Sequence, residues 1–294
     1  MRTQFTGWVM ALVAVTAVLC VLTAPAAGQT PTAAAKTWDP PRTPDGQPDM
    51  QGVWAQQGLS IPSYSIEEGP SEEHYRASGQ QRPASRPSAI VDPPDGKAPY
   101  QPWAAAQRKD VYDNHNNLFR QEHVDPQDRC FLNGVPRHLF LGEFQILQPP
   151  GQVVILNAFA HAYRVISLDG RPDVGGTIKL WMGSSRGRWE GNTLVVDTTN
   201  LNDKTWFDKV GSFHSDALRV VERFTFVDAN TIRYQATIDD PKVFTRPWTL
   251  ALTFAANREN GYELFEEACY EGEVWGHKSF ATLKRPRDHG KDEK

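Results

Sequence analysis

Short segments of alternating apolar and polar residues dominate the second half of this sequence. From Phe144 onward about ten such segments follow one another, and turn-forming residues separate them. The intervals leave almost no room for crossover helices, so neighbouring strands must pair mostly in an antiparallel manner. The expected strands cover residues 144–148, 152–158, 163–169, 178–182, 187–190, 193–198, 217–227, 231–239, 248–255 and 262–268.

This pattern predicts a mainly β fold, either an antiparallel meandering barrel of the calycin or lipocalin type or a two-sheet sandwich. Both architectures limit the number of exposed strand edges. The barrel is favoured because the strands follow one another with short connections. One hairpin is marked by Glu190-Gly191-Asn192, since Gly and Asn tolerate positive φ at low cost.

The first half of the chain has a different character, because Pro and Gly are concentrated in it. Repeated Pro blocks both helices and central strands, so residues 29–102 predict an extended, Pro-rich arm wrapped on the domain. Residues 103–124 contain good helix formers and neither Pro nor Gly, and they predict one helix. The β-rich domain is expected over residues 125–285, followed by a charged tail at 286–294.

Residues 1–28 have the pattern of a signal peptide. Arg2 supplies a positive charge, Trp8 to Leu22 is an uncharged apolar run, and small residues around Ala26 suit cleavage. We expect export to the periplasm or the medium; an uncleaved anchor is the alternative. No second apolar run long enough to span a membrane follows.

Export changes how the cysteines are interpreted. Cys20 leaves with the signal, and the mature chain keeps Cys130 and Cys269, an even pair in an oxidising compartment. We predict that they form one disulfide. A nucleophilic or metal-binding Cys is the alternative, but neither residue lies in a metal-spaced cluster.

Charge and motifs exclude several function classes. The net charge of −4 provides no basic footprint, so nucleic acid is not an expected partner. The sequence contains no Gly-x-Ser-x-Gly elbow, His-Glu-x-x-His motif, phosphate loop or dinucleotide fingerprint. Common hydrolases, zincins and NAD enzymes are therefore disfavoured.

Two charged residues interrupt otherwise apolar strand faces. Glu222 lies in the row Leu218, Val220, Phe224 and Phe226, and Arg164 lies in the row Val154, Leu156, Ala158, Ala160, Ala162, Ile166 and Leu168. Because an unpaired buried carboxylate is very costly, we predict that Arg164 and Glu222 meet inside the domain. The pair is then either a core ion pair that fixes strand register or a lumen pair that grips a polar ligand.

Candidate acid/base chemistry is concentrated in the loop before the strand at 217–227. His214 and Asp216 form a minimal acid/base or metal half-site, and Glu222 completes the set of candidate catalytic residues. His161 lies in another strand or turn and could join them around a divalent metal. Turn and cap roles for His214 and Asp216 are the alternative.

Aromatic residues are frequent in the β-rich half. Rings with polar edges line pockets for sugars and flat apolar ligands, although they also fill barrel cores. The candidate ligand-binding residues are Trp181, Trp206 and Trp248, together with Arg164 and His161.

A long motif from Trp181 to Thr198, with the sequence WMGSSRGRWEGNTLVVDT, resembles a large family of secreted bacterial proteins found in soil and environmental bacteria. The resemblance extends over residues 41–54, 91–96, 130–136, 202–223 and 240–248. Asn192 stands where the family's turn is expected to carry Asp, and either residue serves the turn. The resemblance implies secretion, but no activity and no catalytic residue follow from it.

Three functional hypotheses remain open. The favoured one is a secreted or periplasmic barrel that binds a small molecule or carbohydrate-derived ligand in its mouth. The second is a hydrolase or lyase at the same mouth, with His214 and Asp216 as acid/base groups and Arg164 holding an anionic substrate. The third is a cell-envelope structural or interaction protein, which would expose an apolar patch.

Overall fold

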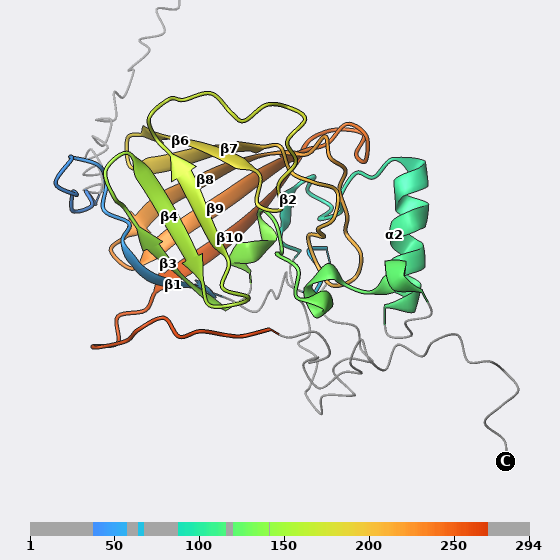
Figure 1. The fold of residues 1–294 in the computed structure, drawn as a ribbon, viewed down its shortest axis with the longest axis horizontal. Helices are drawn as coiled ribbons and strands as arrows, with labels where there is room; N and C mark the ends of the chain where they lie inside the picture. Colours follow the sequence, from blue (N-terminus) through green and yellow to red (C-terminus); the bar gives the residue numbers. More distant parts are fainter. Residues whose placement is uncertain (1–37, 58–63, 68–87, 116–119, 141, 270–294) are drawn as a thin grey trace, which may run out of the picture. The chain divides into compact units, whose positions relative to one another are not determined.

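The structure is a computed structural model that describes residues 38–57, 64–67, 88–115, 120–140 and 142–269. The predicted signal peptide and charged tail lie outside these residues, as does much of the predicted arm. The described part is mainly β, with ten strands in one sheet and one α-helix, α2, at its side (Figure 1).

Nine of the strands close into a barrel, which confirms the barrel prediction. Each barrel strand pairs with the next one along the chain, except that β1 lies between β3 and β10 and so joins the two ends of the sheet. The tenth strand, β2, pairs with Thr249 and Leu250 near the start of β10, on the edge of that strand that β1 joins farther along. The strands are β1 (Gly52–Gln57), β2 (Ile90–Asp92), β3 (Glu143–Leu147), β4 (Gln152–Asn157), β5 (Tyr163–Ser167), β6 (Ser184–Glu190), β7 (Thr193–Thr199), β8 (Arg219–Asp228), β9 (Thr231–Asp239) and β10 (Trp248–Ala256).

The expected arm contributes to the barrel, which corrects the prediction for residues 29–102. Trp54 of β1 is buried and pairs with Phe144 on one side and Ala256 on the other. The sequence offered little warning, because β1 is a single short apolar segment within a Pro-rich stretch. Only the pairing with two other strands makes Gly52–Gln57 a strand.

Two expected strands are absent. Residues 178–182 make only one bridge, at Leu180, and residues 262–268 make only one, at Glu267. Both segments run beside the sheet without joining a ladder. The connection from β5 to β6 is therefore long, and these two strands form the one parallel pair of the barrel.

The inward face of β4 differs from the expectation. Val153 and Ile155 are buried inside the barrel, whereas Val154 and Leu156 face outward and are half-buried. The chain reverses through a tight turn in which Ala160 and His161 both have positive φ. Across this turn odd-numbered positions of β4 pair with even-numbered positions of β5, such as Ile155 with Arg164, so the inward set changes parity.

The predicted hairpin at Glu190 is present. Its two-residue loop joins β6 to β7, and Gly191 has a φ of +60° while Asn192 does not have positive φ. Gly at the first central position of such a loop suits the twist of paired strands.

Helix α2 (Pro102–Asn114) is shorter than the predicted helix at 103–124. It begins at a Pro, which is pre-organised for a first helical turn, and it buries Ala104 and Val111. A separate 3₁₀ turn at Gln121–His123 follows. The cluster of Asn residues from Asn114 onward has low helix propensity, which explains an early end.

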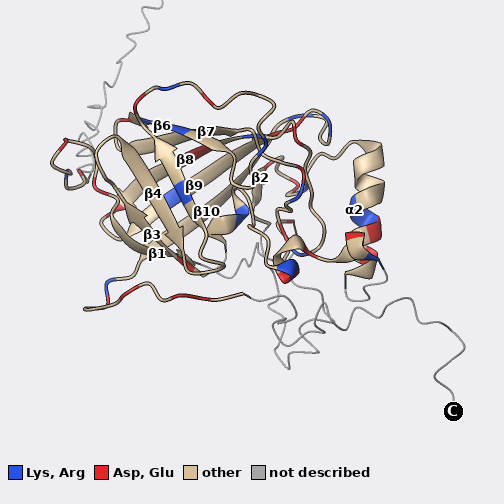
Figure 2. Cartoon of the chain, viewed as in Figure 1, with Lys and Arg blue, Asp and Glu red and all other residues tan. Residues whose placement is uncertain are grey.

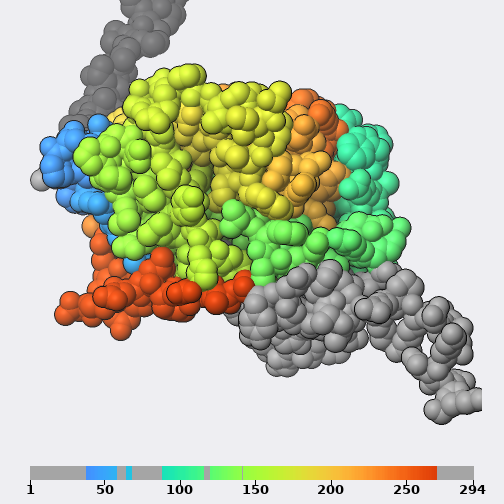
Figure 3. All heavy atoms as spheres, viewed as in Figure 1, coloured from blue at the N-terminus to red at the C-terminus, as the bar shows by residue number. Residues whose placement is uncertain are grey.

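Cys130 and Cys269 form the predicted disulfide, with their Cα atoms 5.6 Å apart. The segment after β10, orange-red in Figure 3, runs along the lower edge of the barrel toward this bond. Charged residues of both signs are interspersed over the strands, loops and α2 in Figure 2. Among the described residues, no helix has the length and apolar character needed to cross a bilayer.

Candidate functional site

One end of the barrel is covered by two stretches of chain, which we call the cap segment (residues 125–140) and the cap loop (residues 200–216). The side-chain amide of Asn157, at the end of β4, donates a hydrogen bond of 2.7 Å to the carbonyl oxygen of His138 in the cap segment. Phe207 of the cap loop packs edge-on against Trp248 at the start of β10. Both stretches therefore close the same end of the barrel.

The two ends of the cap segment are joined to each other by buried charges. Arg137 and Asp125 form a two-pronged ion pair, with N–O distances of 2.8 and 2.6 Å, and Arg137 also donates to Gln127. Both charged side chains are almost fully buried, so neither can lose its partner cheaply. Electrostatic attraction to Asp125 is the main influence that raises the pKa of Arg137 against the opposing effect of burial.

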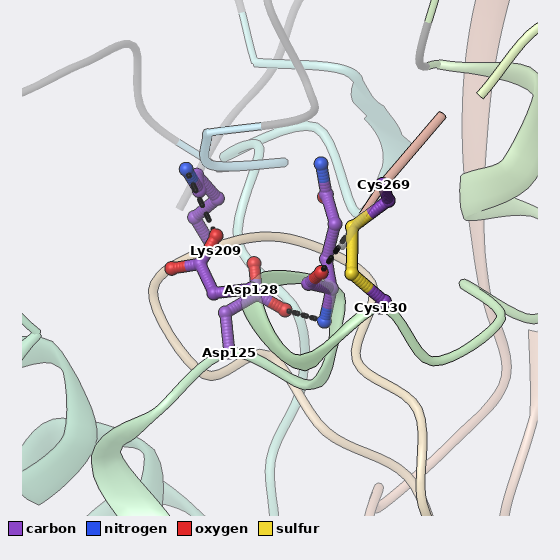
Figure 4. Close-up of a disulfide and its surroundings, with 6 residues drawn as sticks. Asp125, Asp128, Cys130, Lys209 and Cys269 are labelled. Atoms are coloured by element: carbon purple, nitrogen blue, oxygen red, sulfur yellow. Dashed lines mark hydrogen bonds and ion pairs between the residues drawn. A yellow bond between two sulfur atoms is a disulfide. The ribbon is translucent and has the colours of Figure 1, made fainter. Parts of the chain in front are cut away.

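The disulfide ties the same segment to the end of the described chain, as Figure 4 shows. Next to it, Asp128 pairs with Lys209 of the cap loop at 3.5 Å. Burial raises the pKa of Asp128, and the Lys209 ammonium opposes that shift.

The two stretches also touch through a glycine. Gly134 has a φ of +70°, and a Cβ added there would lie 2.5 Å from Oγ1 of Thr205. Only Gly fits this close approach of cap segment and cap loop.

Beneath the cap, Arg164 and Glu222 meet inside the barrel as predicted. Nη1 of Arg164 donates to one carboxylate oxygen at 3.0 Å, and Nη2 donates to the other. Tyr234 donates its hydroxyl to Glu222 at 2.8 Å, and both charged side chains are essentially inaccessible to solvent. Burial, and the neighbouring Glu222 charge, hold the pKa of Tyr234 well above its usual value.

The guanidinium of Arg164 makes further bonds to the hydroxyls of Ser185 and Thr198. These partners come from β6 and β7, whereas Arg164 itself belongs to β5 and Glu222 to β8. With four of its five N–H groups engaged, the side chain has little capacity left for a ligand. The arrangement corresponds to a core ion pair that fixes strand register, and it leaves no free Arg164 to hold an anion.

Three hydrogen-bond acceptors of the cap segment and of the β4 end that it contacts have no partner among the described residues. They are Nε2 of His138, Oδ1 of Asn157 and Oδ1 of Asn133, and all three side chains are buried. His138 contacts the carbonyl oxygen of Gly134 through Nδ1, at 3.2 Å. Burial, and the nearby Arg164 charge, hold the pKa of His138 well below 6.5, so its ring is neutral.

His214 and Asp216 are not brought together as an acid/base pair. His214 is buried, with Nε2 2.6 Å from the Thr205 hydroxyl and Nδ1 2.9 Å from the Ser215 carbonyl oxygen. Burial lowers the pKa of His214, and both ring nitrogens are occupied. Asp216 is partly exposed and pairs with Lys242 at 2.7 Å, which lowers its pKa. The alternative of turn and cap roles fits both residues better.

The remaining candidates scatter as well. His161 lies in the exposed turn after β4 and pairs with Glu266 at 2.9 Å. Trp248 is core filler, packed against Phe207 and Phe244. Trp181 is half-buried and stacks on Phe131 of the cap segment, with ring centroids 4.9 Å apart; Trp206 is half-buried in the cap loop.

No group of three or more His, Cys, Asp or Glu side chains within the described ranges has an arrangement that could hold a metal ion. In particular, the hypothetical set of His161, His214 and Asp216 does not assemble, because each residue has its own partner elsewhere.

Sequence reasoning missed His138, Asn133 and Asn157. A signal existed for Asn157 alone, because it continues the row Val153 and Ile155 and is the one polar residue in that row. The other two lie in irregular structure, where alternation carries no information.

Comparisons of the chain with family models, with curated proteins and with solved structures find no match.

Proposed function

We propose that this protein binds a small polar molecule at the capped end of its barrel. The observation that carries the proposal is that His138 and Asn133 of the cap segment, and Asn157 at the end of β4 that the segment contacts, each bury an acceptor atom without a partner among the described residues. A buried polar atom without a partner costs roughly 1–3 kcal/mol, so a ligand that satisfies several of them gains binding free energy. Small-molecule sites commonly combine an apolar wall with a few such polar groups.

The surroundings support the same proposal. Phe131 of the cap segment and Trp181 form a half-buried aromatic pair, against which a ligand could pack. The hydrolase or lyase alternative has less support, because both nitrogens of His214 already have partners and Asp216 pairs with a lysine.

Export belongs to the proposal. The signal-like start of the sequence supports it, and so does the Cys130–Cys269 bond, since disulfides persist in oxidising compartments. Fractionation of expressing cells, followed by N-terminal sequencing of the mature chain, tests it. Full-length protein in the cytoplasm would contradict it.

Thermal unfolding of the mature protein against a panel of small molecules tests binding. At a ligand concentration about a hundredfold above Kd, stabilisation should be ~2.7 kcal/mol, or roughly 5–11 °C in a domain of this size. The Asn157→Ala variant should lose most of this shift. Asn230→Ala serves as the control, because Asn230 is exposed in the turn between β8 and β9.

The panel should contain neutral sugars and polyols, amines, carboxylates and aromatic acids. A wild-type protein that none of these stabilises would refute the proposal. An equal ligand-induced rise in Tm in Asn157→Ala and in the wild type would mean that the ligand binds elsewhere than at the capped end.

A further inference from the structure

The chain contains two Asn-Gly sequences, at Asn133-Gly134 and at Asn260-Gly261. A glycine after an asparagine leaves the peptide nitrogen between them free to approach the side-chain amide, because no Cβ obstructs the movement. That nitrogen can then attack Cγ of the asparagine in water, without an enzyme. Whether either sequence reacts depends on how firmly the fold holds it.

Asn260 and Gly261 lie at a turn in the segment that follows β10. Both residues are exposed, and a Cβ added at Gly261 would meet no atom within 4 Å. Gly261 has a φ of +77°, and the amide of Tyr262 closes the turn by donating to the carbonyl oxygen of Glu259 at 3.2 Å. No hydrogen bond to another described residue holds the Asn260 side chain. The side chain is therefore free to rotate toward the peptide nitrogen.

The chain is anchored on both sides of this turn. Before it, Nδ2 of Asn257 donates to a carboxylate oxygen of Glu143 at 3.1 Å. After it, the hydroxyl of Tyr262 donates to the other oxygen of Glu143, and Cys269 is bonded to Cys130. The turn is thus an exposed tip between fixed points, where a local change of the backbone is tolerated.

The sequence Asn133-Gly134 lies in a different environment. Asn133 is only 5% exposed, and a Cβ at Gly134 would lie 2.5 Å from Oγ1 of Thr205. The carbonyl oxygen of Gly134 also accepts from the backbone amide of His138 at 3.0 Å. The cap segment must open before the peptide nitrogen of Gly134 can move toward Cγ of Asn133, so the fold protects this site.

We infer that Asn260 is a site of spontaneous deamidation in the folded protein, whereas Asn133 is protected. The peptide nitrogen of Gly261 gives up its proton and forms a bond to Cγ of Asn260. The bond from Cγ to the side-chain nitrogen breaks, and this nitrogen takes up the proton and leaves as ammonia. Water then opens the resulting cyclic imide at either carbonyl, which gives aspartate or isoaspartate. Water is the only other reactant.

Deamidation changes the charge and the geometry of this turn. It adds a carboxylate to a stretch that already exposes Glu259 and Glu263. In the isoaspartate form the backbone runs through the former side chain, which lengthens the turn. The reaction takes place on a surface turn and does not depend on the ligand proposed for the capped end.

Incubation of the purified protein in water enriched in heavy oxygen tests the inference, because only molecules that react during the incubation take up the label at the asparagine. After reduction of the disulfide, trypsin in ordinary water cleaves at Arg129, Arg137 and Arg258 and so places the two asparagines in separate peptides. Mass spectrometry of each peptide then gives the two deamidation rates.

Labelling at Asn260 should be at least about tenfold faster than at Asn133, because every ~1.4 kcal/mol needed to open the cap segment lowers the reactive population at Asn133 tenfold. In the reduced, denatured protein the two sequences should react at similar rates. The inference is overturned if Asn260 stays unlabelled in the folded protein, or if Asn133 reacts there as fast. It is also overturned if the tenfold difference persists in the denatured chain, since the fold is then not its cause.

The Asn260→Gln variant verifies the position of the label. Glutamine keeps an amide at the turn, but its longer side chain closes a ring with the next peptide nitrogen much more slowly. The tryptic peptide that begins at Glu259 contains no other asparagine, so it should remain unlabelled in this variant. Deamidation of that peptide at the wild-type rate would overturn the assignment to Asn260.

Discussion

Replacing Glu222 by Gln is the sharpest test of how the barrel core is organised. The substitution keeps the shape of the side chain and removes its charge, so the Arg164 guanidinium stays buried without a counter-ion. Glu222 receives two bonds from Arg164 and one from Tyr234, all of them inaccessible to solvent. An amide retains one acceptor oxygen, and its NH₂ group faces donors that it cannot satisfy.

Breaking a buried ion pair in this way costs about 3–5 kcal/mol. For a domain of this size, that corresponds to a fall in Tm of roughly 6–20 °C. Urea unfolding followed by tryptophan fluorescence, with the disulfide kept intact, measures the free energy directly.

The matched control lies on β8, the strand of Glu222, and on its neighbour β7. Arg219 of β8 forms a two-pronged pair with Asp197 of β7, and both side chains are substantially exposed. Because exposed pairs contribute little, Asp197→Asn should cost less than about 1 kcal/mol. If Glu222→Gln proves no more destabilising than Asp197→Asn, the reasoning about the sealed pair is refuted.

Three further predictions concern the cap. Lowering the pH from about 7 to about 5 should destabilise the fold. The unfolded chain protonates His138 near pH 6.5, whereas the pKa of the buried ring is lowered and the ring stays neutral in the folded protein. The slope of the unfolding free energy with pH is at most ~1.4 kcal/mol per pH unit for each such histidine, and it should be smaller in His138→Gln than in the wild type. Equal slopes in the two proteins, measured by urea unfolding at both pH values, would contradict this. Replacing Cys130 and Cys269 by Ser, which opens a loop of 139 residues, should cost up to about 5 kcal/mol in the chain-entropy model. Reductant should destabilise the wild type in the same unfolding assay and leave the double variant unchanged. Gly134→Ala should cost about 1–3 kcal/mol more than Gly170→Ala, since both have similar positive φ but only the first places its Cβ against a neighbour. Similar losses of Tm in the two variants would mean that the cap tolerates the added methyl group.

The meeting of Arg164 and Glu222 shows how far the sequence alone reaches. Each is a lone charge in an apolar row. Because an unpaired buried charge is very costly, the two are expected to pair whatever the order of the strands. The same logic of alternation predicted the antiparallel strands, their turns and a closed barrel. The disulfide prediction followed from the expectation that export removes Cys20 and leaves two cysteines.

The sequence alone did not determine the contacts between distant segments. Gly52–Gln57 becomes a strand because β3 and β10 both offer it unpaired edges, and its local composition does not reveal this. Val153 rather than Val154 faces inward because a turn near His161 resets the pairing parity.

The candidate site shows the same division. His214 and Asp216 are two residues apart, yet the cap loop buries one and leaves the other with a lysine. Asn157 and His138 come together only because the cap segment folds over the end of β4. Alternation and charge burial are local rules that any strand obeys, whereas the composition of a site depends on which loops cover which barrel end, and tertiary packing alone decides that.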